Sequence, residues 1–274
     1  MTQGAQEELT AAARVAVDPT VPSPARVWNF WLGGKDHFSA DRALAQRYAE
    51  VVPEMPLIAR LARRFIADTV SGLAAGGIRQ FLDIGTGLPT AENTHEVAQR
   101  LAPDSLVVYV DNDPVVLAHA RALLADSPGG KTAYVDADLR DPAEIVRQAA
   151  QTLDFSKPVA VLLIAVLHFI PDSDDPYRIV ATLMDAVPPG SWLAIAHGAS
   201  DAGADDMPEA ERRYNARAPA RFHARDRAQV GRFFDGLELT GPGLVNLSRW
   251  PQRAAGDGST HRDLAGYCGL ARKP

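Results

Sequence analysis

FLDIGTGLPT, residues 81–90, is the stretch that decides the fold. A short apolar run ends in it at Ile84, and Gly85 and Gly87 follow before the next helical stretch begins. A strand that gives way directly to a helix needs glycines at the turn, because the backbone bends sharply there and can lie close to a ligand. The free N–H groups at the start of the helix would then meet a carboxylate or a phosphate. A tight turn that binds nothing is the alternative interpretation of these residues.

The segments around this turn alternate between short β-branched runs and helical stretches. Such alternation predicts an α/β fold, with a mostly parallel sheet covered by helices on both faces. We expect strands at residues 79–84, 106–110, 132–135, 159–164 and 192–196. We expect helices at residues 91–101, 114–125, 142–151, 175–186 and 225–234. A polar loop rather than a helix separates residues 237–245 from residues 264–271, which predicts an antiparallel pair at the end of the sheet.

The chain divides into three predicted parts. Residues 1–22 mix Ala, Thr, Pro and charge without a usable period, which predicts a disordered tail. Residues 23–76 are predicted to form an N-terminal helical cap; apolar positions recur every three to four residues from Leu57 to Leu73, and Gly76-Gly77 stops that helix. Residues 77–274 are predicted to form a Rossmann-like domain that binds a cofactor.

Composition excludes several classes of protein. The 274 residues are 46% hydrophobic and 23% charged, as in an ordinary globular protein with one large core. The lone Cys268 cannot form an internal disulfide, and the polar beginning lacks the apolar stretch of a secretory signal, so we expect a cytoplasmic protein. The most apolar run, residues 159–167, is too short to cross a membrane, and a formal charge of -6 disfavours nucleic acid as a partner. Scattered histidines make a metal site improbable.

The chemistry of the glycine turn argues against a dinucleotide. Pro89 and Thr90 fill the region where a dinucleotide fingerprint has its third glycine. Asp83 precedes the glycines, and its carboxylate would repel a phosphate but attract the ammonium group of a methionine. The turn therefore favours a cofactor with an amino-acid end.

Acidic residues follow the next two strands. Asp111 stands about 24 residues beyond Gly87, close to the separation at which a carboxylate binds the two hydroxyls of a ribose. The alternative is that Asp111 and Asp113 only cap the helix that Pro114 opens.

The third strand ends in YVDADLRDP, residues 134–142. Asp138 is placed to accept a hydrogen bond from an adenine amino group, with Leu139 against the ring, whereas Asp141 precedes a proline and is expected to cap a helix. Because the carboxyl ends of successive strands meet at one edge of the sheet, these residues together describe an adenosine joined to an amino acid.

Several long strings between Pro24 and the C-terminus are distinctive: PARVWNFWLGGKDHFSADR, QFLDIGTGLPTAENTHEVAQ, VVYVDNDPVVLAHARALL, ADLRDP, AVLHFIPD, RFFDGLEL and GPGLV. Through these strings the chain resembles the S-adenosyl methyltransferases formerly grouped as a domain of unknown function. It implies a class I methyltransferase fold and S-adenosylmethionine as cofactor. It also implies that Asp83, Gly85 and Gly87 line the amino-acid end of the cofactor, that Asp111 binds the ribose and that Asp138 lies near the adenine. The resemblance names no methyl acceptor.

The segment from residue 26 to residue 42 gathers aromatic residues around Gly33 and Gly34. Its aromatic residues are Trp28, Phe30, Trp31 and Phe38. Such a segment can fold over the cofactor as a lid, with Arg26 or Lys35 meeting the cofactor carboxylate. The alternative is an aromatic brace that seals the first helix to the sheet.

Two histidines and an arginine-rich stretch complete the candidates. His168 follows the fourth strand and His197 ends the fifth, where either is a candidate general base or acceptor-orienting group, or else a histidine hydrogen-bonded at a strand end. The arginines of residues 212–227 predict a solvated helical face, with an anion-binding acceptor pocket as the alternative.

These observations predict a methyltransferase that uses S-adenosylmethionine and acts on an unidentified small-molecule acceptor. The alternative function is a non-catalytic sensor of the cofactor, and an NAD-dependent oxidoreductase is disfavoured by the missing glycine. The candidate catalytic residue is His168. The expected cofactor-binding residues are Arg26, Lys35, Asp83, Gly85, Thr86, Gly87, Asp111, Asn112, Asp138, Leu139 and Ala165.

Overall fold

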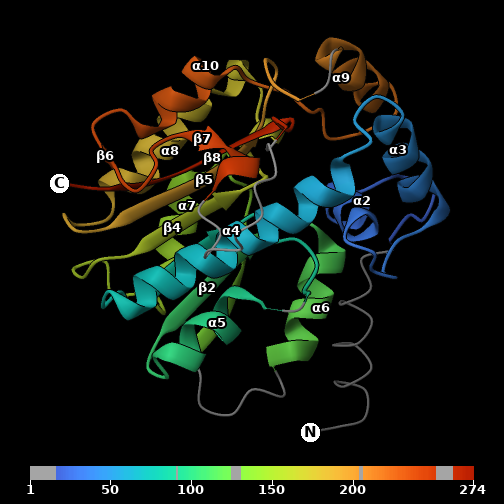
Figure 1. Ribbon diagram of the computed structural model, residues 1–274. Helices are drawn as coiled ribbons and strands as arrows, with labels where there is room; N and C mark the ends of the chain where they lie inside the picture. The colour runs from blue at the N-terminus through green and yellow to red at the C-terminus, as the bar shows by residue number, and fades with distance from the viewer. Residues whose placement is uncertain (1–16, 91, 125–130, 204–205, 251–261) are drawn as a thin grey trace, which may run out of the picture.

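A computed structural model describes residues 17–90, 92–124, 131–203, 206–250 and 262–274, and its centre is a mixed sheet of eight strands (Figure 1). The strands are β1 (Gln80–Ile84), β2 (Leu106–Asp111), β3 (Lys131–Asp136), β4 (Ala160–Ile164), β5 (Trp192–Gly198), β6 (Glu238–Leu239), β7 (Val245–Asn246) and β8 (Gly266–Arg272). Their order is β3-β2-β1-β4-β5-β8-β6, and β7 pairs with β8 beside β6. Strands β1 to β5 are parallel, and β8 runs antiparallel to β5.

The strand order creates a place for a ligand. The chain proceeds from β1 to β2 and β3 on one side, and then returns to place β4 on the other side of β1. At such a switch point the loops that follow neighbouring strands diverge, and a crevice opens at the carboxyl ends of the strands.

Helices cover both faces of the sheet (Figure 1). The α-helices are α2 (Pro24–Trp31), α3 (Ser39–Ala49), α4 (Met55–Ala75), α5 (Thr94–Leu101), α6 (Pro114–Leu124), α7 (Pro142–Ala149), α8 (Pro176–Asp185), α9 (Met207–Asn215) and α10 (Arg227–Gly231). Short 3-10 helices are η1 (Leu167–Phe169), η2 (Asp172–Asp174), η3 (Arg232–Phe234) and η4 (Leu247–Arg249). Within β1, Phe81 joins the apolar core beneath α4 and α5, whereas its neighbour Leu82 joins the core beneath α7 and α8.

The N-terminal helices share a core with the sheet. Val27 of α2, Leu44 of α3 and Phe65 of α4 are buried in the same apolar cluster as Phe81 of β1. Helix α3 also packs against α9, which precedes strands β6, β7 and β8 in the chain. The cap formed by α2, α3 and α4 is therefore held over the end of the sheet at which the crevice opens.

The expected α/β architecture is confirmed, including the parallel order and the antiparallel end. Two details differ. Residues 237–245, expected as one strand, form β6 and β7 around a turn in which Gly241 and Gly243 have φ values of +64° and +79°. Helix α9 lies outside the helical stretches expected between the strands, although it carries the first two arginines of the expected helical face at residues 212–227. Residues 225–234, expected as one helix, form α10 and η3. The tail predicted for residues 1–22 falls mostly on residues 1–16, outside the described part.

No helix among the described residues is both long enough and apolar enough to span a membrane.

Candidate functional site

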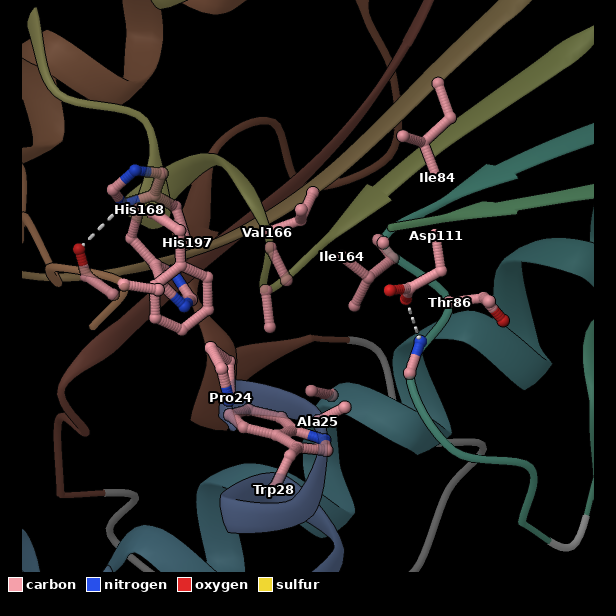
Figure 2. A pocket seen from close by; sticks show the side chains of 18 of the residues that line it. Pro24, Ala25, Trp28, Ile84, Thr86, Asp111, Ile164, Val166, His168 and His197 are labelled. Atoms are coloured by element: carbon pink, nitrogen blue, oxygen red, sulfur yellow. Dashed lines mark hydrogen bonds between the residues drawn. The ribbon is translucent and has the colours of Figure 1, made fainter. Parts of the chain in front are cut away.

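A cavity of about 340 Å³ opens at the carboxyl ends of β1, β2, β4 and β5 and is covered by α2 and α4 (Figure 2). It is lined by every residue expected at the site except Arg26 and Lys35. The strand order therefore brings together side chains that lie as far apart in sequence as Asp83 and His168.

The two glycines of the turn after β1 have different surroundings. Gly85 has a φ of +72°, and a Cβ atom added to it would lie 2.4 Å from Cγ2 of Val166. Gly87 has a φ of +66°, but a Cβ atom there would meet nothing within 4 Å. Gly85 is thus required by the fold, because the loop after β4 packs directly on it. Gly87 instead leaves the backbone open to a ligand.

The turn after β4 carries a second unusual backbone. Ala165 has a φ of +59°, and its N–H donates to the carbonyl oxygen of Ala196 at 2.9 Å. A non-glycine residue in the left-handed region costs about 1 kcal/mol or more, and such residues gather at ligand sites. Ala165 lines the cavity together with its chain neighbours Ile164 and Val166.

Asp111 lies at the centre of the cavity wall. Its Oδ2 accepts the N–H of Gly87 at 2.9 Å, a bond drawn in Figure 2, and its Oδ1 accepts the N–H of Asp113 at 2.9 Å. Burial raises the pKa of Asp111 to about 6, against the opposing effect of these two backbone donors. The carboxylate therefore fixes the glycine turn to the end of β2 and also faces the cavity.

Asp83 is buried under the same turn. Its Oδ2 accepts the hydroxyl of Thr94 at 2.6 Å, and Asp83 is only 4% exposed. Burial raises its pKa, while the Thr94 hydrogen bond and the positive charge of Arg63 act in the opposite direction. Asp83 thus places a buried carboxyl group at the end of β1, just before the turn that contains Gly87.

The loops after β2 and β3 form the third wall. Asn112 donates from Nδ2 to Oδ2 of Asp138 at 3.0 Å, and Nη1 of Arg140 lies 3.2 Å from the same oxygen. Nε of Arg140 also donates to Asp174 at 2.7 Å, which joins this wall to the loop after β4. Leu139 is buried and lines the cavity beside Asp138. Asp141 caps α7 as expected, because its carboxylate accepts the N–H of the helix's first turn.

The two cations expected near the cofactor carboxylate lie elsewhere. Arg26 is buried, with Nε 2.8 Å from Oδ2 of Asp41 and Nη2 donating to the carbonyl oxygen of Val21 at 2.6 Å. Lys35 is exposed. Both belong to the aromatic segment of residues 26–42, but Arg26 of α2 is paired with Asp41 of α3 and does not line the cavity.

Arg63 of α4, which sequence reasoning missed, lines the cavity instead. Its Nη2 donates to the carbonyl oxygen of Glu92 at 3.1 Å, while its Nε is buried without a hydrogen-bond partner among the described residues. In the sequence, Arg63 is one of several arginines within an amphipathic helix, and its spacing does not distinguish it from them. Its buried, unpartnered donor is suited to a carboxylate.

The cap is tethered to the cavity wall at its first residues. The hydroxyl of Ser23 donates to Oδ2 of Asp113, and the N–H of Ser23 donates to Asp41 at 2.9 Å. Because the N–H of Asp113 donates to Asp111, the cap and the central carboxylate share a hydrogen-bonded path. Trp28 and Trp31 line the cavity (Trp28 is labelled in Figure 2), whereas Phe30 and Phe38 do not.

The two histidines have different environments. Nδ1 of His197 bonds the carbonyl oxygen of Gly198 at 2.8 Å, and its Nε2 accepts from Nη1 of Arg225 at 2.9 Å. Burial lowers the pKa of His197 to about 3. His168 is 5% exposed, and its Nδ1 has no hydrogen-bond partner among the described residues. Burial also lowers the pKa of His168, with further contributions from His197 and Arg225. Of the two rings, only His168 has free hydrogen-bonding capacity.

The arginine-rich stretch separates into surface and core residues. Arg212 and Arg213 are paired with Glu209 on the outer face of α9, each at 2.7 Å. Arg225 is 2% exposed and donates to the carbonyl oxygens of Leu167 and Ile170, as well as to His197. Arg225 therefore ties the loop after β4 to the end of β5.

The chain is similar in sequence and structure to known proteins. The model of the S-adenosyl methyltransferase family matches residues 10–274 of the chain. The crystal structure of a DUF574 family protein from Streptomyces avermitilis MA-4680 is 43% identical, with a TM-score of 0.87 over 94% of this chain and 99% of that chain. The crystal structure of a candidate methyltransferase from Thermobifida fusca YX is 37% identical, with a TM-score of 0.85 over 96% of this chain and 97% of that chain.

A more distant structure shares the fold. Magnesium protoporphyrin IX methyltransferase from Synechocystis PCC 6803, crystallised with bound S-adenosylhomocysteine, is 14% identical, with a TM-score of 0.51 over 90% of this chain and 93% of that chain. The comparison with curated proteins found no match to the chain. The family match covers both the cap and the sheet. The chain therefore belongs to the S-adenosyl methyltransferases, and it is an S-adenosylmethionine-dependent methyltransferase with a Rossmann-like class I fold.

Proposed function

We propose that the protein transfers the methyl group of S-adenosylmethionine to a small molecule that binds in the same cavity, between the cofactor and helix α2. A volume of about 340 Å³ falls within the range of small-molecule pockets. Trp28 of α2 and Ile58 of α4 line the cavity together with the strand ends, so the ligand is covered on the side opposite the sheet. A cavity covered on this side suits a small acceptor better than a polymer.

The observation that carries the proposal is the open space at Gly87. A ligand can approach its backbone closely there, since a Cβ atom would meet nothing within 4 Å. The amino-acid end of the cofactor fits this place, because Asp83 supplies a negative charge for the ammonium group. Arg63 supplies a buried Nε, unpartnered among the described residues, for the carboxylate.

The remaining parts of the cofactor follow along the same wall. Asp111 presents two carboxylate oxygens to the vicinal hydroxyls of the ribose. Asp138 accepts from the amino group of the adenine, Leu139 packs on its ring and Asn112 holds the Asp138 carboxylate in place. Thr86 and Ala165 line the cavity at the two turns that flank the reacting centre.

The residues of this chain act mainly by orientation. S-adenosylmethionine, when bound, supplies an electrophilic methyl group on a sulfonium. The chain holds the acceptor atom opposite the departing sulfur and excludes water, and correct orientation alone can account for about 7 to 11 kcal/mol of rate enhancement. His168 lies on the acceptor side and is the group available to hold or accept a proton there. No observation favours a non-catalytic sensor.

The first test is the binding of S-adenosylhomocysteine, measured by calorimetry and by thermal shift. We expect Asp111→Ala to weaken binding by about 1.5 to 3 kcal/mol, because it removes the charged acceptor of the ribose hydroxyls. Asp235→Ala, at an exposed position outside the cavity, is the control and should leave binding unchanged. The absence of heat and of a thermal shift with the unmodified protein would contradict the proposal. An unchanged dissociation constant in a folded Asp111→Ala variant would restrict Asp111 to holding the turn. Competition between NAD and S-adenosylhomocysteine tests the disfavoured alternative, an NAD-dependent oxidoreductase.

A further inference from the structure

The part of the cavity beneath the cap is a chamber of aromatic rings. We define the aromatic chamber as Tyr48, His168, Phe169, Tyr214 and Phe222, all of which line the cavity. Phe222 stands at its centre, with ring centroids 4.7 Å from His168, 5.7 Å from Tyr48 and 5.8 Å from Tyr214. These rings are tilted or edge-on to one another rather than stacked, so their faces remain available to a planar guest.

The chamber contains no formal charge. The Asp and Arg side chains that line the cavity are Arg63, Asp83, Asp111, Asp113, Asp138 and Arg140, and all of them belong to the walls assigned above to the cofactor. A charged acceptor in the chamber would lose its water without gaining a counterion, which is strongly unfavourable. Charges of both signs lie around the chamber, Arg225 near His168 and Glu211 and Asp41 near the two tyrosines, so the surroundings favour neither ion. The chamber therefore favours a neutral guest.

Three polar side chains in the chamber have unused hydrogen-bonding capacity. Tyr48 and Tyr214 are 3% and 2% exposed, and neither phenol makes a hydrogen bond to another described residue. Nδ1 of His168 is likewise buried without a partner in the described structure. Burial raises the pKa of both tyrosines above the ordinary value and lowers that of His168, so all three groups are uncharged near neutral pH. Because unpaired buried polar groups are destabilising, they point to a guest that pairs with them.

We propose that the aromatic chamber binds an uncharged aromatic alcohol of the phenol class and that its hydroxyl oxygen accepts the methyl group. The guest's ring packs among Phe169, Tyr214 and Phe222, and its oxygen substituents accept hydrogen bonds from the tyrosine hydroxyls. In the transfer, an oxygen lone pair forms the new O–CH₃ bond while the S–CH₃ bond breaks and its electron pair stays on sulfur, which becomes a neutral thioether. The hydroxyl proton passes to the imidazole of His168 and from there to solvent. The inference rests on the proposed function.

The test compares three ligands that share one ring system. The protein is first saturated with S-adenosylhomocysteine, and 2-naphthol, the anion 2-naphthoate and the cation 2-naphthylmethylammonium are then titrated by calorimetry. We expect 2-naphthol to bind at least about tenfold more tightly than either ion, because only the ions must be desolvated without a partner. With S-adenosylmethionine instead, mass spectrometry should detect 2-methoxynaphthalene. If S-adenosylhomocysteine does not bind, the result counts against the proposed function. Normal saturation followed by equal or tighter binding of an ion, or by no binding of 2-naphthol, would overturn the inference alone.

Variants identify the groups that recognise the acceptor. Tyr48→Phe and Tyr214→Phe each remove one hydroxyl and should weaken 2-naphthol binding by about three- to tenfold while leaving the affinity for S-adenosylhomocysteine unchanged. Tyr177→Phe is the matched control, since its hydroxyl is also buried without a partner among the described residues but does not line the cavity. If both chamber variants bind 2-naphthol like the unmodified protein, the assigned recognition is wrong.

His168→Gln tests the path of the proton. We expect it to lower kcat by about a hundredfold or more, with KM for 2-naphthol changed much less and S-adenosylhomocysteine binding unchanged. A residue with a purely structural role would instead lower the melting temperature or raise KM. An unchanged kcat in the folded variant would remove His168 from the mechanism.

Discussion

In the proposed function, single charged residues determine which part of the cofactor each wall of the cavity accepts. Arg26 and Lys35 are closest in sequence to the glycine pair of the aromatic segment, yet Arg26 is neutralised by Asp41 of α3 and Lys35 is exposed. Arg63 reaches the cavity from the middle of α4. A single sequence cannot reveal an ion pair between different helices, nor can it reveal which arginine of a helix faces a cavity.

The raised pKa of Asp111 predicts that cofactor binding depends on pH, if Asp111 binds the ribose as proposed. Ribose hydroxyls donate to the ionised carboxylate, so the cofactor binds best to the deprotonated form. Because burial places the pKa at about 6, the affinity for S-adenosylhomocysteine should be full above that pH. Below it, the affinity should fall by up to about tenfold per pH unit. Calorimetry between about pH 5 and pH 8, with circular dichroism as a check of folding, measures this profile.

Asp111→Asn is the control for that profile. The variant should bind more weakly throughout and lose most of the pH dependence, because the amide does not titrate. Asp83 faces the same cavity, and burial raises its pKa as well, so any slope that remains in Asp111→Asn belongs to other groups such as Asp83. Equal slopes in the two proteins would show that Asp111 does not control the binding.

At the scale of elements, the turn between β1 and α5 separates a folding role from a binding role. Gly85→Ala brings a Cβ atom to 2.4 Å from Val166 at a φ of +72°, so we expect it to lower the free energy of unfolding by several kcal/mol. Gly87→Ala adds its methyl group to open space, so we expect only the backbone penalty of about 1 to 2 kcal/mol but a loss of S-adenosylhomocysteine binding of at least about tenfold.

Gly77→Ala is the matched control for both substitutions. It has a φ of +99° with nothing within 4 Å, and it lies outside the cavity. Its stability loss, measured by denaturant unfolding, isolates the cost of the positive φ, and its affinity for S-adenosylhomocysteine should be normal. Normal binding by Gly87→Ala would show that the ligand does not approach this backbone.

The cap segment of residues 26–42 is expected to gain hydrogen-exchange protection when the cofactor binds. Trp28 and Leu32 line the cavity, and Ser23 bonds to Asp113, which in turn bonds to Asp111. Saturating S-adenosylhomocysteine should therefore increase hydrogen-exchange protection across residues 26–42, as measured by mass spectrometry of peptides. Helix α7, on the other face of the sheet, should show no change.

The opposite pattern of exchange identifies a brace. If residues 26–42 keep the same protection while the turn at Gly85 gains protection, the aromatic segment seals the core without responding to the cofactor. Deleting residues 1–22 then gives no further information, since that deletion leaves α2 in place under either interpretation.

At the scale of the whole molecule, the cap and the sheet are expected to unfold together. Buried residues of α2, α3 and α4 share one apolar cluster with the strands, so neither part keeps its core without the other. We expect a single calorimetric transition whose measured and van't Hoff enthalpies agree. S-adenosylhomocysteine at a hundred times its dissociation constant should stabilise the protein by about 2.7 kcal/mol without splitting the transition. Two resolved transitions would instead show that residues 23–76 unfold separately from residues 77–274.

Most of this architecture could be predicted from the sequence, because it depends on local periodicity. Each parallel strand is marked by its own short apolar, β-branched run, and the turn at Gly85 is marked by the two glycines that directly follow the first of these runs. The break between β6 and β7 could not be predicted, since it depends on how Gly241 and Gly243 turn against β8. The aromatic chamber could not be predicted either, because Tyr48, His168 and Phe222 come from three distant segments that only the tertiary fold brings together.

The position of β8 has a consequence for the synthesis of the protein. Residues 266–272 lie between β5 and the two short strands β6 and β7, although they follow all three in the chain. On the ribosome, β5 is therefore exposed along one edge until β8 has emerged, and β6 and β7 have no partner at all. An unpaired apolar strand edge promotes aggregation. We therefore expect a chain that ends before residue 266 to aggregate rather than to fold into a weakened enzyme, because the edge of β5 stays unpaired in it.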